Sequence, residues 1–406
     1  MQMLKNFFYQ RPMRGRNPHE AHRVATPLEL FFDLIYVVAI SAAASGLHHA
    51  ISAGHGISGT AHYLFAFFCI WWAWMNFTWF ASAFDTDDVS FRLTTFIQMF
   101  GSLVQAAGIS SLFQEPADIR IGLIGYCIMR IGLVMQWLRV AVQAPAYRKT
   151  ALFYAAGVSL MQFGWIGLFL LPDRSYEYLF SAILMIGELS VPLMAERYGR
   201  TPWHSHHMAE RYGLLVIIVL GEGILGSTNT IATAVAEHSL SLPVILSLGL
   251  GSFAVIFLLW WVYFNLPEER LHSMDAAIRQ VFPTAYGHYV IFAALTVVGT
   301  GLELLADSLI NAHQAHTGHS VSALSAISIL SLAVFFSLSG ILFISHLIDP
   351  VHRRLNKRCF LALLLCALPV VAVSIGLSLN LAVWLSTLAP LMMLCAQRKR
   401  HYKSTE

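Results

Sequence analysis

The stretch from residue 242 to residue 265, LPVILSLGLGSFAVIFLLWWVYFN, contains no Asp, Glu, Lys or Arg. An α-helix needs about 20 consecutive apolar residues to cross the hydrocarbon core of a bilayer, and this stretch exceeds that length. It is also too long to be a strand buried in the core of a soluble protein. The stretch therefore predicts a transmembrane helix.

Similar apolar runs recur along the 406 residues, of which 57% are apolar and only 12% charged. Soluble domains carry about 25% charged residues, so this composition argues against a cytosolic enzyme, a disordered protein and a nucleic-acid binder. Twelve runs separated by charged or Pro/Gly-rich connections predict an all-α polytopic membrane protein. The last two runs are joined so closely that eleven spans remain an alternative. The predicted spans are 27–50, 60–82, 92–113, 121–141, 150–171, 177–196, 210–235, 242–265, 284–306, 322–346, 359–379 and 380–396.

The positions of the basic residues test this count. Of the 25 Lys and Arg residues, 22 fall in the N-terminal arm, the C-terminal tail, or the even-numbered connections and the adjoining ends of the spans. Because connections on the cytoplasmic side are enriched in Lys and Arg, both termini are predicted to be cytoplasmic, which requires an even number of spans. No cleavage site follows a short apolar region, so the first span is predicted to be retained.

Two segments suggest that the chain is built from two similar halves. WWAWMN at residues 71–76 is similar to WWVYFN at residues 260–265. Six spans in each half would make the halves parallel repeats, as in some secondary transporters, although chance similarity between aromatic pairs is an alternative. The predicted organisation is a basic cytoplasmic arm (1–26), a first half (27–196), a His-rich cytoplasmic linker (197–209), a second half (210–396) and a basic cytoplasmic tail (397–406).

Glu222 is the sharpest candidate for a functional residue inside the membrane. It follows Arg211 by eleven residues, or about 16 Å along a helix, which places it near the bilayer midplane. Gly221, Gly223 and Gly226 surround it and allow close helix approach or local unwinding. Since intramembrane ionisable groups are costly, we interpret Glu222 as a proton or cation site, with a paired structural carboxyl as the alternative.

Arg130 lies halfway through the fourth predicted span. A guanidinium keeps its proton in proteins, so this residue needs an anion nearby, and Glu188, Glu222 and Glu303 are the intramembrane candidates. The pair could be a static clamp or a gate. We predict these four residues as the ion-coupling site, with Arg130 as the counter-charge of Glu222.

A second set of polar residues falls near the cytoplasmic ends of the predicted spans. Glu29 and Asp33 are four residues apart and therefore share one helix face, and His288 is of a type that titrates near neutral pH. The set predicts a cytoplasmic gate of salt bridges, with simple interfacial caps as the alternative. Its members are Glu29, Asp33, Asp85, Asp87, Arg92, His207, Glu210, Arg211, Tyr286 and His288.

Metal and cofactor chemistry is weakly indicated. His204, His206, His207 and Glu210 fall within seven residues and could bind a divalent metal, yet they match no closed zinc pattern. The five cysteines form no CxxC pair and are predicted to pack among apolar residues. No cofactor is predicted, and neither a G-x-S-x-G nor an H-E-x-x-H motif occurs. Imidazoles considered for a haem are His48, His62, His288 and His346.

Four segments together resemble the bacterial low temperature requirement A family of membrane proteins. TPLELFFDL at 26–34 is similar to its opening motif, and the stretch from HMAERYGL to LGE at 207–222 is similar to its central motif. FDTDDVSFRLTTFIQM at 84–99 and YGH at 286–288 add to the resemblance. The resemblance implies a multi-span protein of the bacterial cell membrane, linked by name to growth in the cold. The motif positions it implies are Glu29, Asp33, Asp85, Asp87, Arg92, His207, Glu210, Arg211, Glu222 and His288.

We therefore expect an ion- or proton-coupled secondary transporter or permease, surrounded by the lipid bilayer, with an unidentified small-molecule or ion substrate. One alternative is a non-transporting membrane protein that supports growth in the cold by sensing or structural contacts. Another is a membrane-embedded redox or metal-dependent enzyme. Nucleic acid is not an expected partner, because the composition argues against a nucleic-acid binder.

Overall fold

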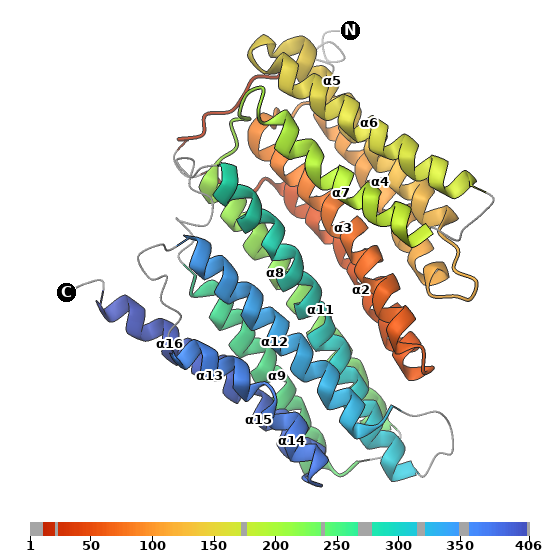
Figure 1. Cartoon of the computed structure of the whole chain (residues 1–406), viewed down its shortest axis with the longest axis vertical. Coiled ribbons are helices and arrows are strands. Elements are labelled where there is room, and N and C mark those ends of the chain that lie inside the picture. Colours follow the sequence, from red (N-terminus) through yellow and green to blue (C-terminus); the bar gives the residue numbers. More distant parts are fainter. Residues whose placement is uncertain are drawn as a thin grey trace. The chain divides into compact units, whose positions relative to one another are not determined.

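The computed structural model describes residues 11–20, 23–171, 177–236, 240–266, 278–314, 321–348 and 357–403. Within these ranges the chain forms helices and their connections, with no β-strand (Figure 1). The prediction of an all-α polytopic membrane protein is therefore confirmed.

Each predicted span corresponds to one helix or to a pair of shorter helices. The longest, α11, extends from Ile278 to Gln314. The others are α2 (Pro27–Ser52), α3 (Gly56–Phe84), α4 (Val89–Leu112), α5 (Arg120–Gln143), α6 (Arg148–Leu170), α7 (Glu177–Ala195), α8 (Ser205–Ala236), α9 (Leu242–Phe264), α12 (Ala323–Ile348), α13 (Lys357–Leu365), α14 (Leu368–Ser374), α15 (Leu379–Ser386) and α16 (Leu388–Lys403).

In the part of the chain that the structure describes, eleven helical segments are long and apolar enough to cross a membrane. Helix α4 is not among them, because the face it packs on α5 is polar and includes the buried side chains of Gln98, Ser102 and Gln105. The segments 357–374 and 379–397 are two separate candidate spans. Gly376 lies between them with a φ of 90°, a backbone conformation that glycine adopts without steric cost.

The chain divides into two compact units. Unit 1 comprises residues 1–39 and 69–211, and unit 2 comprises residues 40–68 and 212–406. In unit 1, α4, α5, α6 and α7 pack in sequence order. In unit 2, α11 packs along α12, while α9 packs against α15 and α16. The predicted parallel repeat of the two halves stays a prediction.

Residues 11–20 and 23–26 form an N-terminal strap that packs on the helices of unit 1. Met13 is fully buried, and its backbone N–H donates to Oε1 of Gln143 at 2.8 Å. The N–H of Arg16 donates to the carbonyl of Ala83 at 2.9 Å. The described part of the predicted basic arm is thus built into the fold of unit 1.

Candidate functional site

Glu29, in the first turn of α2, lies within ion-pair distance of two basic residues of α8. Its Oε1 lies 3.0 Å from Nε2 of His207 and 3.1 Å from Nη1 of Arg211, and all three side chains are completely buried. The local sequence fixes this position, because Thr26 and Glu29 form a capping box. The N–H of Thr26 donates to Oε2 of Glu29 at 2.8 Å, and the N–H of Glu29 donates to the Thr26 hydroxyl at 3.3 Å.

Asp33 lies one turn further along α2 and meets the same arginine. Nη2 of Arg211 donates to Oδ1 of Asp33 at 2.7 Å and to the hydroxyl of Thr78 at 3.2 Å. The indole N–H of Trp74 also donates to Asp33 Oδ1, at 2.6 Å. The predicted shared face of Glu29 and Asp33 therefore exists, and Arg211 bridges both carboxylates.

Arg23 and Asp85 extend this group of charges. Nη2 of Arg23 lies 4.0 Å from Glu29 Oε1 and 3.8 Å from Asp85 Oδ2. Burial, reinforced by the charge of Glu29, raises the pKa of Asp85 to about 6, and burial lowers the pKa of Arg23. We refer to Glu29, Asp33, His207, Arg211, Arg23 and Asp85 together as the Arg211 cluster.

The three aspartates that follow α3 have different roles. Asp85 accepts the N–H of Asp87 at 2.8 Å and lies in the Arg211 cluster. Asp87 forms an exposed ion pair with Arg92 at 2.8 Å. Asp88 caps α4 by accepting the N–H of Phe91, and it also binds Arg139. Of the predicted gate residues in this segment, only Asp85 is therefore part of the buried charge network.

The other predicted gate residues fall into both units. Glu210 accepts the N–H of Ala25 at 3.0 Å and so attaches the N-terminal strap to α8. Tyr286 and His288 belong to unit 2. There Nδ1 of His288 bonds the Thr284 carbonyl at 2.7 Å, and the imidazole is completely buried.

Arg130 of α5 is paired with Glu188 of α7 at 3.3 Å, and both side chains are buried. Glu188 also accepts the indole N–H of Trp72 at 2.8 Å and the hydroxyl of Tyr126 at 3.2 Å. The guanidinium of Arg130 lies over the ring of Tyr126, 4.3 Å from its centroid, and donates to its hydroxyl. Of the three carboxylates considered from the sequence, Glu188 rather than Glu222 is the counter-ion of Arg130.

A second group of ionisable residues lies in unit 2 and is mainly acidic. It contains Glu222 of α8, Glu303 and Asp307 of α11, and His48 of α2, and we call it the acid cluster. Nε2 of His48 lies 2.8 Å from Oδ2 of Asp307. Glu303 is close enough to interact electrostatically with the other three, and the carboxyl group of Glu222 lies near the side chain of Ser41.

Glycines of α8 and α11 make room for the acid cluster. A Cβ atom at Gly226 would lie only 1.6 Å from Oε1 of Glu303, so the carboxylate occupies the space beside this glycine. A Cβ at Gly299 would lie 2.6 Å from the Cα of Gly223. The helix continues through both α8 glycines, which therefore provide close approach rather than unwinding.

The acid cluster has more potential negative charge than positive charge. Its three carboxyl groups share one imidazole, so full ionisation would leave a net negative charge within membrane-spanning helices. Like charges in a poorly solvated site oppose each other's ionisation, and uncompensated charge is expensive in a bilayer. The arrangement can therefore bind protons, or a cation, in exchange.

Three of the four metal candidates bind other groups, and the fourth, His206, is exposed. His204 accepts the N–H of His207 at 3.2 Å, and its other ring nitrogen bonds the carbonyl of Glu20 at 2.9 Å. His207 faces Glu29, while Glu210 accepts from the strap. Across the ranges that the structure describes, no group of three or more His, Cys, Asp or Glu residues has a metal-binding arrangement.

Among the described residues, eleven helical segments apolar enough to cross a membrane, with ionisable side chains between them, define a polytopic α-helical membrane protein. The family model described as bacterial low temperature requirement A protein (LtrA) matches residues 24–396, and the chain belongs to this family. The match extends well beyond residue 300, where the distinctive sequence motifs end. The chain is also similar to an uncharacterized protein of Rhizobium meliloti (strain 1021), with 27% identity over 292 residues, or 68% of each chain.

Three residues of these sites were not among the predicted site residues. Arg23 lies three residues before the capping Thr26, but in the sequence it is one basic residue of a basic arm. Asp307 follows Glu303 by four residues, and this helical spacing was a usable signal. His48 was predicted only as a possible haem ligand. Its partner Asp307 is 259 positions away in the sequence, so sequence spacing gives no sign of their pairing.

The raised pKa of Asp85 predicts a pH-dependent stability. The pKa of Asp85 is about 6 in the folded protein, whereas the pKa of an unfolded Asp is about 3.9. The contribution of Asp85 to folding stability is therefore largest below about pH 3.9. This contribution is lost as the pH rises through about 6. We expect Asp85→Asn to gain up to about 3 kcal/mol in unfolding free energy relative to the wild type over this range.

Thermal unfolding in detergent, measured at several pH values across this range, checks the expectation for Asp85→Asn. Asp87→Asn is the control, because Asp87 belongs to the same segment but is exposed. A stability difference between Asp85→Asn and wild type that stays flat or falls with rising pH would contradict the assignment.

Proposed function

We propose that this LtrA-family protein is a proton- or cation-coupled membrane transporter whose coupling site is the acid cluster. The observation that carries the proposal is the grouping of Glu222, Asp307 and the imidazole of His48 around Glu303 within membrane-spanning helices. Secondary transporters commonly hold coupling-ion sites near the bilayer midplane. The substrate whose movement would be coupled remains an unidentified small molecule or ion.

Charge neutrality supplies the physical reason for coupling. A carboxyl group is protonated in a low-dielectric environment and ionised when water reaches it. It therefore takes up and releases a proton as its surroundings change. Glu222 is half-buried, so it is neither sealed in the core nor fully solvated. Because Glu222 lies near Ser41 of α2 and Glu303 contacts Gly226 of α8, the proton occupancy of these carboxyl groups would depend on the relative positions of the helices.

The Arg211 cluster is the proposed gate of the transporter. Helices α2 and α8 carry residues of both clusters, since Glu29 and Arg211 lie near their starts and His48 and Glu222 lie further along them. The topology from the basic residues assigns those starts to the cytoplasmic side. Breaking the bridges from Arg211 would free the starts of these two helices to move.

Proton binding can be tested without knowing the substrate. Infrared difference spectra of the purified protein, recorded between acidic and alkaline pH, report the C=O stretch of protonated carboxyl groups. We expect Glu303→Gln and Glu222→Gln each to remove intensity from the buried-carboxyl band. The matched control is Glu115→Gln, which removes an exposed carboxyl in the connection between α4 and α5 and should leave that band unchanged.

Transport is tested in proteoliposomes containing the pH dye pyranine, with imposed gradients of H⁺, Na⁺ or K⁺. Protein-dependent proton movement that Glu222→Gln abolishes, and Glu115→Gln leaves intact, would support the proposal. Folding is checked by the elution volume and melting temperature of each variant. If neither acid-cluster variant alters the infrared band or the flux, while melting temperatures shift, the non-transporting structural role is the better account.

A further inference from the structure

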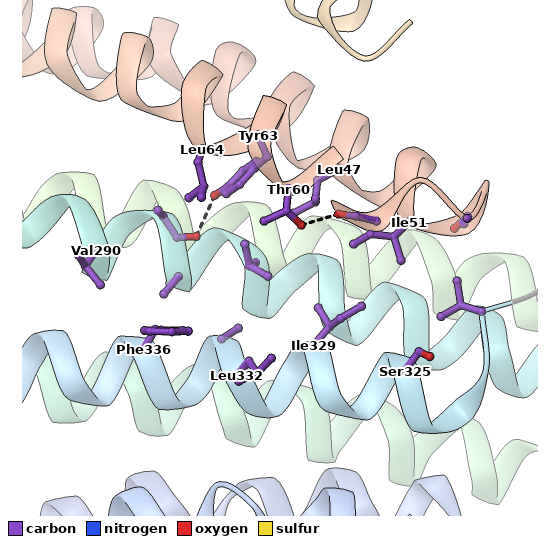
Figure 2. A pocket seen from close by; sticks show the side chains of 18 of the residues that line it. Leu47, Ile51, Thr60, Tyr63, Leu64, Val290, Ser325, Ile329, Leu332 and Phe336 are labelled. Atoms are coloured by element: carbon purple, nitrogen blue, oxygen red, sulfur yellow. Dashed lines mark hydrogen bonds between the residues drawn. The ribbon is translucent and has the colours of Figure 1, made fainter. Parts of the chain in front are cut away.

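A cavity of about 790 Å³ lies in unit 2, between the end of α2, the start of α3, and the helices α11 and α12. Figure 2 shows Leu47 and Ile51 of α2 and Tyr63 and Leu64 of α3 on one side of this space, with Ile329 and Phe336 on the other. The volume falls within the range of about 300–1,000 Å³ that is typical of small-molecule sites. None of the groups in the acid cluster lines this cavity.

The cavity has a closed floor and an open rim. Tyr63, Ala293 and Ala333 at the floor are at most 5% exposed, and the Tyr63 hydroxyl donates to the carbonyl of Ala293 at 2.8 Å. By contrast, Leu332 and Phe336 on the rim are 56% and 49% exposed. In a chain that spans a bilayer, such exposed apolar side chains face lipid, so the opening is continuous with the lipid-facing surface of unit 2.

The lining is mainly apolar, with serine side chains at one end (Figure 2). Hydroxyl groups lie at one end, where Ser322 and Ser325 bond each other at 2.8 Å at the start of α12. Val290 and Phe336 mark the other end. From Ser322 to Phe336, α12 rises about 21 Å. This length exceeds the depth of one leaflet of the hydrocarbon core, which is about 15 Å.

We propose that this groove is a binding site for one acyl chain of a membrane phospholipid, with the head group at the Ser322–Ser325 end. No Asp, Glu, Lys, Arg or His is among the described residues that line it, which disfavours an ionic metabolite. The length, the lateral opening to lipid and the hydroxyl end all match an amphiphile that enters from the bilayer. The inference is independent of the proposed transport activity.

Photoreactive phospholipids test both the occupancy and the orientation of the chain. Purified full-length protein in detergent is titrated with phosphatidylglycerol that carries a diazirine either near the head group or at the end of one acyl chain. After irradiation, the labelled peptides are identified by mass spectrometry. We expect saturable labelling, with the head-proximal probe reacting near 321–325 and the terminal probe reacting near 290 and 336.

Two variants fill the groove, and one matched variant does not. Ile329→Trp adds bulk within the groove and Leu332→Trp adds bulk at its rim, while Phe343→Trp changes an exposed residue of the same helix outside it. We expect the apparent Kd to rise about tenfold in Ile329→Trp, to rise in Leu332→Trp and to stay unchanged in Phe343→Trp. Melting temperatures confirm that each variant is folded.

Three outcomes would overturn the proposal. One is labelling that increases linearly with probe and is equal in all three variants, as expected of lipid that merely surrounds the protein. Another is a reversed order of the two probes along the groove. The third is exclusion of both probes together with cross-links between two protein copies through these residues, which would make the groove a protein–protein interface.

Discussion

The Arg211→Met variant is expected to be about 3–5 kcal/mol less stable than the wild type, because it leaves buried carboxylates without their cation. Glu29 and Asp33 both depend on this guanidinium, and all three side chains are at most 3% exposed. Methionine keeps much of the side-chain volume, so the loss would reflect charge rather than a large cavity. Thermal unfolding in detergent, followed by intrinsic fluorescence, measures the difference.

The matched control for this prediction is Arg92→Met. Arg92 also pairs with an aspartate, but its side chain is 61% exposed, and exposed ion pairs contribute only about 0–1 kcal/mol. Combining Arg211→Met with Glu29→Gln and Asp33→Asn should recover part of the lost stability, since no buried charge is then stranded. Equal melting temperatures for Arg211→Met and Arg92→Met would refute the bridging role.

The second large effect is expected at the pair of Arg130 and Glu188. Glu188→Leu leaves the Arg130 guanidinium buried without a carboxylate and should destabilise the protein by about 3–5 kcal/mol. The double variant Arg130→Met/Glu188→Leu removes both charges and should be more stable than either single variant. Denaturation curves of the wild type, both single variants and the double variant complete the cycle.

The double-mutant cycle separates a clamp from independent residues. A coupling energy near zero would mean that Arg130 and Glu188 do not act on each other, whatever their distance. The proton flux of the double variant adds a functional readout. Retained flux identifies the pair as a static clamp, while lost flux in a stable double variant identifies it as part of the gate.

Helix positions could be predicted from the sequence because uninterrupted apolar runs have few alternatives to spanning a bilayer. The short connection between the last two predicted spans left eleven or twelve spans open, and the structure interrupts the helix there, at Gly376. Helix α4 shows the limit of this reasoning. Its Gln98, Ser102 and Gln105 pack against α5, so polar side chains that lower its apolarity are covered by protein.

Parts of the candidate site could be predicted where its residues lie close together in the sequence, or where an ionisable residue falls inside a predicted membrane span. Glu29 and Asp33 share a helical face, and Glu222, Arg130 and Glu303 stand out because intramembrane charges are costly. Which charges meet depends on contacts between distant segments. The partner of Arg130 and the pairing of His48 with Asp307 could therefore only come from the folded chain.

The packing of the strap affects how the protein can be handled. With Met13 fully buried and the N–H of Arg16 engaged by Ala83, an affinity tag joined directly ahead of this stretch would compete with it for the surface of α3 and α5. A shortened gene that starts near residue 27 would remove Arg23 and admit solvent to Asp85. A purification tag should therefore not replace or adjoin residues 11–26.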